Sequence, residues 1–72
     1  MGRVPPTWSI EEAGKERYIV DEARKRRFLL HYGDYLSLPD GKEWHRGYLH
    51  HYRGNEYEVW WEKEIVAYVV KP

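Results

Sequence analysis

Four histidines are the side chains of this 72-residue chain best suited to bind a metal ion or to transfer a proton at neutral pH. They are His31, His45, His50 and His51. On a strand, the adjacent His50 and His51 point to opposite faces and cannot hold one ion together. His45 and His50 are an odd number of positions apart, which also separates them unless Gly47 carries a bulge. Cysteine is absent and no convergent carboxylate completes a tetrahedral set, so we expect no metal site and no cofactor.

Carboxylates close to two of these histidines are the remaining candidates for acid–base chemistry. Asp34 lies near His31 in sequence, and Asp40 and Glu43 lie near His45. Their spacing does not define an acid–base pair, hydroxyl side chains are scarce, and so small a domain has little room for a pocket. The sequence favours a non-catalytic protein. The enzymatic alternative is a small oligomer with its active site at a symmetry axis.

A basic run is the main candidate for contact with phosphate. It comprises Arg24, Lys25, Arg26 and Arg27. With Tyr48 or Trp60 stacking on bases, it would make a nucleic-acid-binding module, which is the alternative function. The formal net charge of zero and the four glutamates in the segment 56–64 argue against this function.

A β-hairpin is predicted for Tyr48–Trp61, with Gly54 and Asn55 as its two-residue loop. The expected cross-strand pairs are Arg53–Glu56, His51–Glu58 and Leu49–Trp60 on one face, and Tyr52–Tyr57, His50–Val59 and Tyr48–Trp61 on the other. The first face carries complementary polar pairs and the second a block of aromatic rings.

Either face of this hairpin could be the buried one. In the first interpretation the aromatic rings are core and Leu49 and Trp60 face solvent. In the second, Leu49 and Trp60 are core and the tyrosines form an open stacking platform. In both cases Trp60 and Trp61 put one indole on each face. Both faces must then be covered or used for binding, which favours a partner or self-association.

The N-terminal region is predicted to contain an irregular tail and one short helix. Residues 1–7 form the tail and residues 8–72 a single small domain. Ser9 to Glu12 is a capping box, with Trp8 and Ala13 placed for a hydrophobic staple. Gly14 then ends the helix after one or two turns.

The central segment 21–32 allows two predictions. Asp21 is a good helix N-cap and Gly33 a good helix end, which favours a helix. The apolar residues between them do not form a helical stripe, so we prefer a β-hairpin in which Glu22–Arg26 form an exposed turn after the strand Tyr18–Val20.

The remaining strands follow from turn residues and apolar patterning. A strand through Leu36 ends at the turn 39–41, and the next strand runs from Trp44 to Tyr52. The last strand, Ile65–Val70, is apolar on both faces. We expect a barrel interior on one side of it and a docked helix or a second subunit on the other.

About five short strands in so small a chain predict an all-β or mainly β fold, a small barrel or a strongly curled antiparallel sheet. The pattern Gly33-Asp34-x-Leu36, Trp44-x-x-Gly47-x-Leu49-x-x-Tyr52 and Tyr57-x-Val59 resembles SH3-like barrels. It is loosely similar to the small plasmid-type dihydrofolate reductases, which line their active pore with Val-Gln-Ile-Tyr. The nearest segment here, Ile65–Tyr68, lacks the glutamine, so the resemblance does not imply their activity.

Composition suggests where the protein works. A chain without cysteine suits a reducing compartment, and no segment is apolar enough to cross a bilayer, so we expect a cytoplasmic protein without membrane partners. The chain has no Gln, a single Asn and many charges, a bias that is typical of heat-resistant proteins.

The function that the sequence favours is a small binding module for another protein or for a second copy of itself. Aromatic residues and arginine dominate interface energies, which selects the contact residues. They are Trp60, Leu49, Trp44, Tyr35 and Arg46, with Arg24 to Arg27 as a charged rim.

Overall fold

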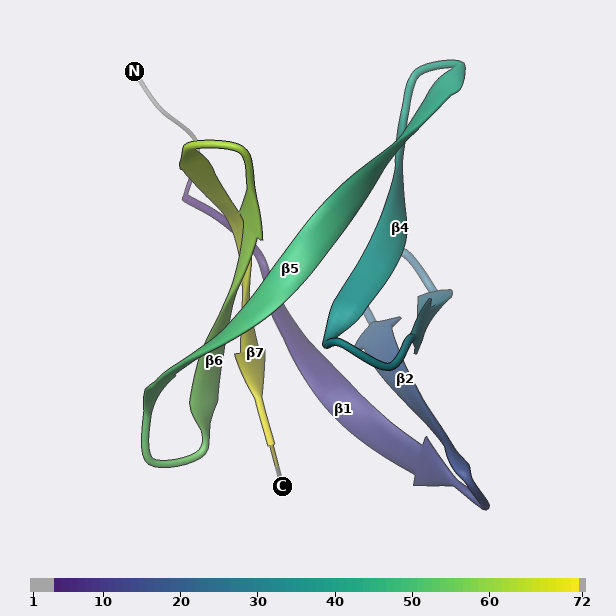
Figure 1. Cartoon of the computed structure of the whole chain (residues 1–72), viewed down its shortest axis with the longest axis vertical. Helices are drawn as coiled ribbons and strands as arrows, with labels where there is room; N and C mark the ends of the chain where they lie inside the picture. The colour runs from purple at the N-terminus through teal and green to yellow at the C-terminus, as the bar shows by residue number, and fades with distance from the viewer. Residues whose placement is uncertain (1–3, 72) are drawn as a thin grey trace.

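Seven strands form one curled sheet in the computed structural model, which describes residues 4–71 (Figure 1). In chain order they are β1 (Thr7–Ala13), β2 (Glu16–Asp21), β3 (Arg26–Leu30), β4 (Tyr35–Asp40), β5 (Glu43–Arg53), β6 (Glu56–Trp61) and β7 (Glu64–Val70). The spatial order is β3-β2-β1-β7-β6-β5-β4. Neighbours are antiparallel except β1 and β7, which are parallel. A bridge between His31 and Tyr35 joins the two edge strands at one end, so the sheet nearly closes into a barrel.

The all-β prediction is confirmed, with seven strands instead of about five. The short helix predicted at Ser9–Glu12 is wrong, because these residues lie in β1. So short a helix would form few internal hydrogen bonds, whereas β1 pairs with β2 on one side and with β7 on the other. Strand geometry also turns Trp8 into the interior, where it is 6% exposed. Of the predicted N-terminal tail, residues 1–3 lie outside the described residues, and β1 begins at Thr7.

The segment 21–32 is the predicted hairpin, with a turn at residues 22–25 between β2 and β3. Asp21 does act as a cap, but for the turn: its side chain accepts a hydrogen bond from the Arg24 amide at 3.3 Å. Lys25 closes the turn in the left-handed region with φ 54°. The same local signal that suggested a helix N-terminus thus serves a tight turn.

The β5–β6 hairpin has the predicted two-residue loop but a different register. Of the predicted pairs, only Arg53–Glu56 forms, and the register then shifts between Arg53 and His51, which leaves Tyr52 as an extra residue in β5. The observed pairs are His51–Tyr57, His50–Glu58, Leu49–Val59 and Tyr48–Trp60. The bulge therefore places Tyr48 and Trp60 side by side on the same face of the sheet.

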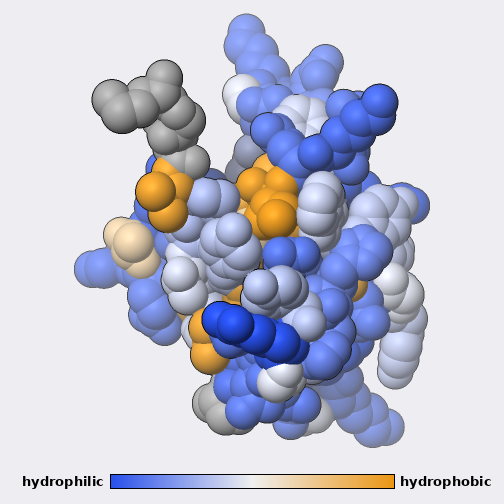
Figure 2. All heavy atoms as spheres, turned by 90° about the vertical axis from the view of Figure 1, so that its left-hand side faces the viewer, coloured by the Kyte–Doolittle hydropathy of each residue, from blue (hydrophilic) through white to orange (hydrophobic). Residues whose placement is uncertain are grey.

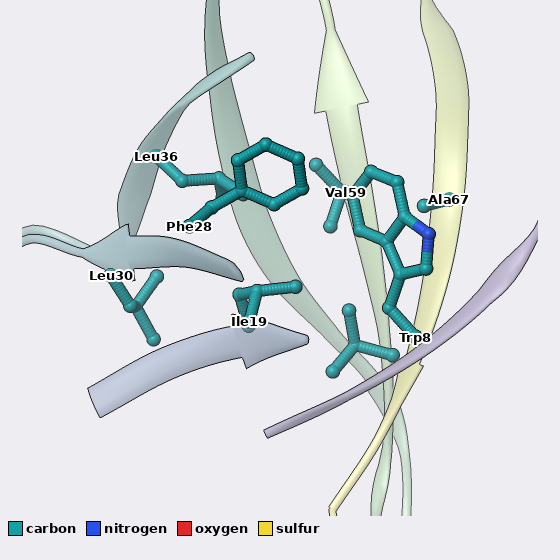
Figure 3. Packing of buried hydrophobic residues seen from close by; sticks show 8 residues of the cluster. Trp8, Ile19, Phe28, Leu30, Leu36, Val59 and Ala67 are labelled. Atoms are coloured by element: carbon teal, nitrogen blue, oxygen red, sulfur yellow. The ribbon is translucent and has the colours of Figure 1, made fainter. Parts of the chain in front are cut away.

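The core lies inside the curled sheet, and its buried side chains come from six of the seven strands. It consists of Trp8, Ile19, Phe28, Leu30, Leu36, Val59, Ala67 and Val69. Figure 3 shows side chains from several strands meeting in this interior, with the Trp8 and Phe28 rings 5.4 Å apart between centroids. The seventh strand, β5, contributes a buried glycine. A Cβ at Gly47 would lie 2.7 Å from Leu38 Cδ1 and 3.0 Å from Val59 Cγ1, so the absence of a side chain makes room for both.

The last strand, β7, has the expected buried face. Ala67 and Val69 are fully buried, whereas Tyr68 and Val70 are exposed on the outer side. No described residue is helical, so the helix that we expected to cover this outer side is not found within residues 4–71, and none of these residues forms a helix that could cross a membrane.

Candidate functional site

The long strand β5 carries exposed aromatic and cationic side chains on its outer face. Side chains alternate along a strand, and Gly47 faces the core, so Arg46 and Tyr48 face outward together with Trp44. The pairing adds outward side chains from the neighbours, since Tyr48 lies opposite Tyr35 in β4 and opposite Trp60 in β6. We call the group Tyr35, Trp44, Arg46, Tyr48 and Trp60 the outer aromatic face.

Contacts hold several of these side chains in place. The Arg46 guanidinium lies 4.4 Å from the centre of the Tyr35 ring, and the Tyr35 and Tyr48 rings are 6.4 Å apart. The Trp60 indole donates a hydrogen bond to Glu58 at 3.1 Å. Trp44 stays 68% exposed and Tyr48 43% exposed. The face therefore combines fixed rings with two large rings that remain open to a partner.

The charges on this face are nearly balanced. Arg46 contributes one positive charge, and Glu58 contributes one negative charge beside Trp60. His50 stands opposite Glu58 on the same side of the sheet. The side of the molecule shown in Figure 2 is mostly hydrophilic, with a few separate hydrophobic areas.

The structure brings together four of the five predicted contact residues: Trp60, Trp44, Tyr35 and Arg46. Leu49 lies apart from these four residues, because it points inward, opposite Val59, and packs against the core. The bulge at Tyr52 causes this change, since it moves every residue before it by one position relative to β6. Both interpretations of the hairpin placed Leu49 and Trp60 on the same face. The structure instead turns Leu49 toward the core and Trp60 toward the outside.

Two tyrosines belong to this region that the predicted interface did not include. Tyr48, predicted among the aromatic rings of the hairpin and in the nucleic-acid alternative, is at the centre of the outer aromatic face. Tyr68 lies opposite Glu58 on β7 and is also exposed. The alternation in the last strand indicated that Tyr68 shares one face with Val70, but the sequence did not show that this face adjoins Trp60.

The basic run lies on the β2–β3 hairpin, and two of its cations are already paired. Arg26 binds the Asp21 carboxylate at 2.9 Å, and Arg27 binds Glu11 at 3.1 Å. The Arg27 guanidinium also lies 4.3 Å from the centre of the Tyr18 ring. These contacts reduce the free positive charge that the run would offer to a phosphate backbone.

Asp21 is the buried charged residue of this hairpin. Burial by itself would raise the pKa of its carboxyl group, but the hydrogen bond from Arg26, the Arg24 amide and the charges of both arginines lower the pKa below its usual value. The carboxylate therefore stays ionised at neutral pH and fixes Arg26 at the open end of the barrel.

A cavity of about 600 Å³ opens at this end of the barrel. Its walls include Trp8, Phe28 and Trp61, and the His45 ring lies 4.2 Å from the Trp61 ring. His45 Nε2 is 3.3 Å from Asp40, so one of the carboxylates near His45 in the sequence also contacts it in the structure. The Asp40 carboxylate is largely exposed, so water competes for His45 and the pair resembles a surface ion pair rather than an acid–base pair poised for catalysis.

The other histidines serve structural contacts. His31 stacks on Tyr35 at 4.7 Å, while Asp34, its neighbour in sequence, binds Arg17 at 3.2 Å. The expected pairing of His51 with Glu58 is wrong, because the shifted register places His51 against Tyr57 and within 2.9 Å of the Gly54 carbonyl oxygen. Within residues 4–71, no group of three potential metal ligands comes together.

Comparison of the chain with models of protein families, with curated proteins and with solved structures gives no match. The segment Ile65–Tyr68, which we compared with the pore segment of small reductases, lies in β7 with Ala67 buried and Tyr68 exposed. The function has to be inferred from the surfaces of this chain alone.

Proposed function

We propose that this protein is a non-catalytic binding module that engages a protein partner through the outer aromatic face. The observation that supports the proposal most directly is the exposed pair of rings on β5, Trp44 and Tyr48, held on either side of Arg46. Tryptophan, tyrosine and arginine are the side chains that contribute most to binding energy at protein interfaces.

The free energy that one contact could contribute to binding can be worked out from the exposure of Trp44. A buried aromatic residue removes about 150–250 Å² from water, and Trp44 is still 68% exposed. At about 25 cal/mol per Å², covering it would contribute about 3 kcal/mol before the costs of association. A few such rings are enough for a specific complex.

The charge of the face favours a protein over a nucleic acid. A phosphate backbone is bound by several unpaired cations, and its affinity falls steeply with salt. The outer aromatic face has Arg46 balanced by Glu58, and half of the basic run is already neutralised by Asp21 and Glu11. A second copy of the chain is within the class of partners that this face would accept.

A selection of displayed peptides tests the proposal. We expect the protein to enrich peptides whose binding is lost in the Trp44→Ala and Tyr48→Ser variants and changes little with added salt. The matched control is Tyr32→Ser, which removes a ring that is 92% exposed in the β3–β4 turn, outside the face. Peptides lost equally in all three variants would contradict the proposal. Tight, salt-sensitive binding of a mixed-sequence oligonucleotide would support the nucleic-acid alternative instead.

Three finer predictions accompany this proposal: an SH3-like arrangement of the barrel, a cytoplasmic location and resistance to heat.

A sizing column with light scattering measures the oligomeric state of the protein. A salt-insensitive dimer that Trp60→Ala converts to a monomer would identify a second copy as the partner.

A further inference from the structure

The two edge strands of the sheet, β3 and β4, meet at the His31–Tyr35 bridge and separate beyond it. We call this opening the β3–β4 seam. It contains a groove of about 470 Å³, lined by Arg26, Arg27, Phe28, Leu29, His31, Ser37, Pro39 and Trp44. The groove is distinct from the cavity at the end of the barrel, although Arg26, Phe28 and Pro39 border both.

The β3 edge of the seam presents unpaired backbone groups. The His31 N–H donates to the Tyr35 carbonyl across the seam, so His31 directs its backbone toward β4. Backbone direction alternates along a strand, and β3 pairs with β2 without a register shift, so Leu29 and Arg27 also direct their N–H and C=O groups into the seam. Among the described residues these groups have no ladder partner, since the bridge is the single pairing between the two edges.

The β4 edge is a poorer partner for a new strand. Tyr35 directs its carbonyl toward β3, so Ser37 and Pro39 face the seam by the same alternation. Proline has no backbone N–H, and its presence is a common protection of an edge strand. The backbone groups that could pair with an added strand therefore lie mainly on β3, which contains no proline.

The β3 side of the seam carries several cationic side chains, two of which are already paired with carboxylates. Its lining includes two arginines and a histidine but no carboxylate. The exposed Arg24 and Lys25, which form no ion pair within residues 4–71, lie in the turn next to the wide end of the seam. Because Arg26 is paired with Asp21 and Arg27 with Glu11, the unpaired positive charge beside the seam comes from Arg24 and Lys25.

We propose that the β3 edge binds an extended acidic peptide segment of a partner protein as an additional strand. Its backbone would pair with Arg27 and Leu29, and a carboxylate at its end would lie against Arg24 and Lys25. Strand addition of this kind takes affinity from main-chain hydrogen bonds and specificity from alternate side chains. The inference goes beyond the outer aromatic face, because it uses the backbone of a different strand and specifies the charge of the partner.

A synthetic peptide of alternating valine and glutamate is the probe. We expect it to bind in fluorescence anisotropy. We also expect it to slow hydrogen exchange at the amides of Arg27 and Leu29, which should exchange fast in the free protein because they have no ladder partner. Two control peptides separate the contributions. One replaces each glutamate by lysine, and the other keeps the side chains but methylates every second backbone nitrogen. Both are expected to lose binding.

Variants of the protein test the same contacts from the other side. Leu29→Pro removes the N–H that faces the seam, at an edge position where proline is tolerated, and should weaken binding at least about fivefold relative to Leu29→Thr, which keeps the N–H. Arg27→Glu should weaken binding more than Lys15→Glu, which makes the same charge change in the β1–β2 turn. Trp60→Ala should leave binding of this peptide unchanged, which separates this site from the outer aromatic face.

Several results would overturn the inference. Equal binding of the lysine peptide would remove the charge argument, and equal binding of the methylated peptide would remove the backbone argument even if Leu29→Pro did not fold. A dimer of the free protein that Leu29→Pro abolishes would show that a second copy, not an acidic peptide, occupies the edge.

Discussion

Replacement of Gly47 by alanine tests the packing that gives β5 its inner and outer faces. The new methyl group would lie 2.7 Å from Leu38 Cδ1 and 3.0 Å from Val59 Cγ1, whereas carbon atoms in contact prefer about 3.5–4.0 Å. Gly47 is not among the residues with positive φ, so the effect is steric and not one of backbone strain.

The expected cost follows from which neighbour can move. Leu38 is half-buried and can shift its end, but Val59 is fully buried and β-branched, with little rotamer freedom. Overpacking costs about 1–3 kcal/mol, and a gain of about 0.4–1 kcal/mol from the stiffer unfolded chain partly offsets it. We expect Gly47→Ala to lower the free energy of unfolding by about 1.5 kcal/mol.

Urea unfolding followed by tryptophan fluorescence measures this change, and a second substitution gives it a control. Leu38→Ala removes the closest atom, so the double variant should be more stable than the sum of the single effects by about 1 kcal/mol. A neutral Gly47→Ala, or strictly additive effects in the double variant, would refute the reasoning that Gly47 is the space into which Leu38 and Val59 pack.

Three other predictions concern stability. Because the pKa of Asp21 is lowered, its pairing with Arg26 stabilises the fold above a pH of about 4, and this contribution is lost as the pH falls through the pKa of the folded state. The Asp21→Asn variant should therefore be less stable than the original chain at neutral pH. In an acid titration, the difference in unfolding free energy between the two proteins should shrink. Lys25→Gly should raise the free energy of unfolding by about 0.5–1 kcal/mol, because φ is 54° there, and a thermal melt that shows a loss would contradict this. Trp8→Ala should cost about 3–5 kcal/mol, whereas Trp44→Ala should change unfolding by less than about 0.5 kcal/mol, and similar losses in urea would disprove the assignment of one ring to the core and the other to the surface.

Local turn chemistry made much of the fold predictable. The loop at Gly54 and Asn55, the turn predicted at 39–41 and the hairpin over 21–32 all depend on residues close in sequence. The structure places the second of these turns at 41–42, because Pro39 and Asp40 still belong to β4. The helix at Ser9–Glu12 was wrongly predicted for the complementary reason. Its capping signal is also local, but pairing of β1 with β7, which is remote in sequence, outweighs it.

The candidate site depended on one residue that no local pattern reveals. The bulge at Tyr52 keeps the Arg53–Glu56 ion pair beside the loop and still sets Leu49 against Val59 on the core side. The uninterrupted register would have set His50 against Val59. Burial of two apolar side chains favours the shifted pairing, and Tyr48 joins Trp60 outside as a consequence. The unpaired backbone groups at the β3–β4 seam cannot be read from the sequence either, because they depend on which two strands form the edges of the sheet.

The parallel pairing of β1 with β7 has a consequence for the way the chain folds during synthesis. It joins Thr7 to Tyr68 and Trp8 to Val69, contacts that span nearly the whole of the described chain. The β2–β3, β4–β5 and β5–β6 hairpins can form as soon as their own residues emerge, but Trp8 has no β7 to cover it until the last strand has left the ribosome. Contacts of such high sequence separation slow folding. A nascent or truncated chain would therefore leave Trp8, the largest core side chain, without its β7 partner until that strand is present.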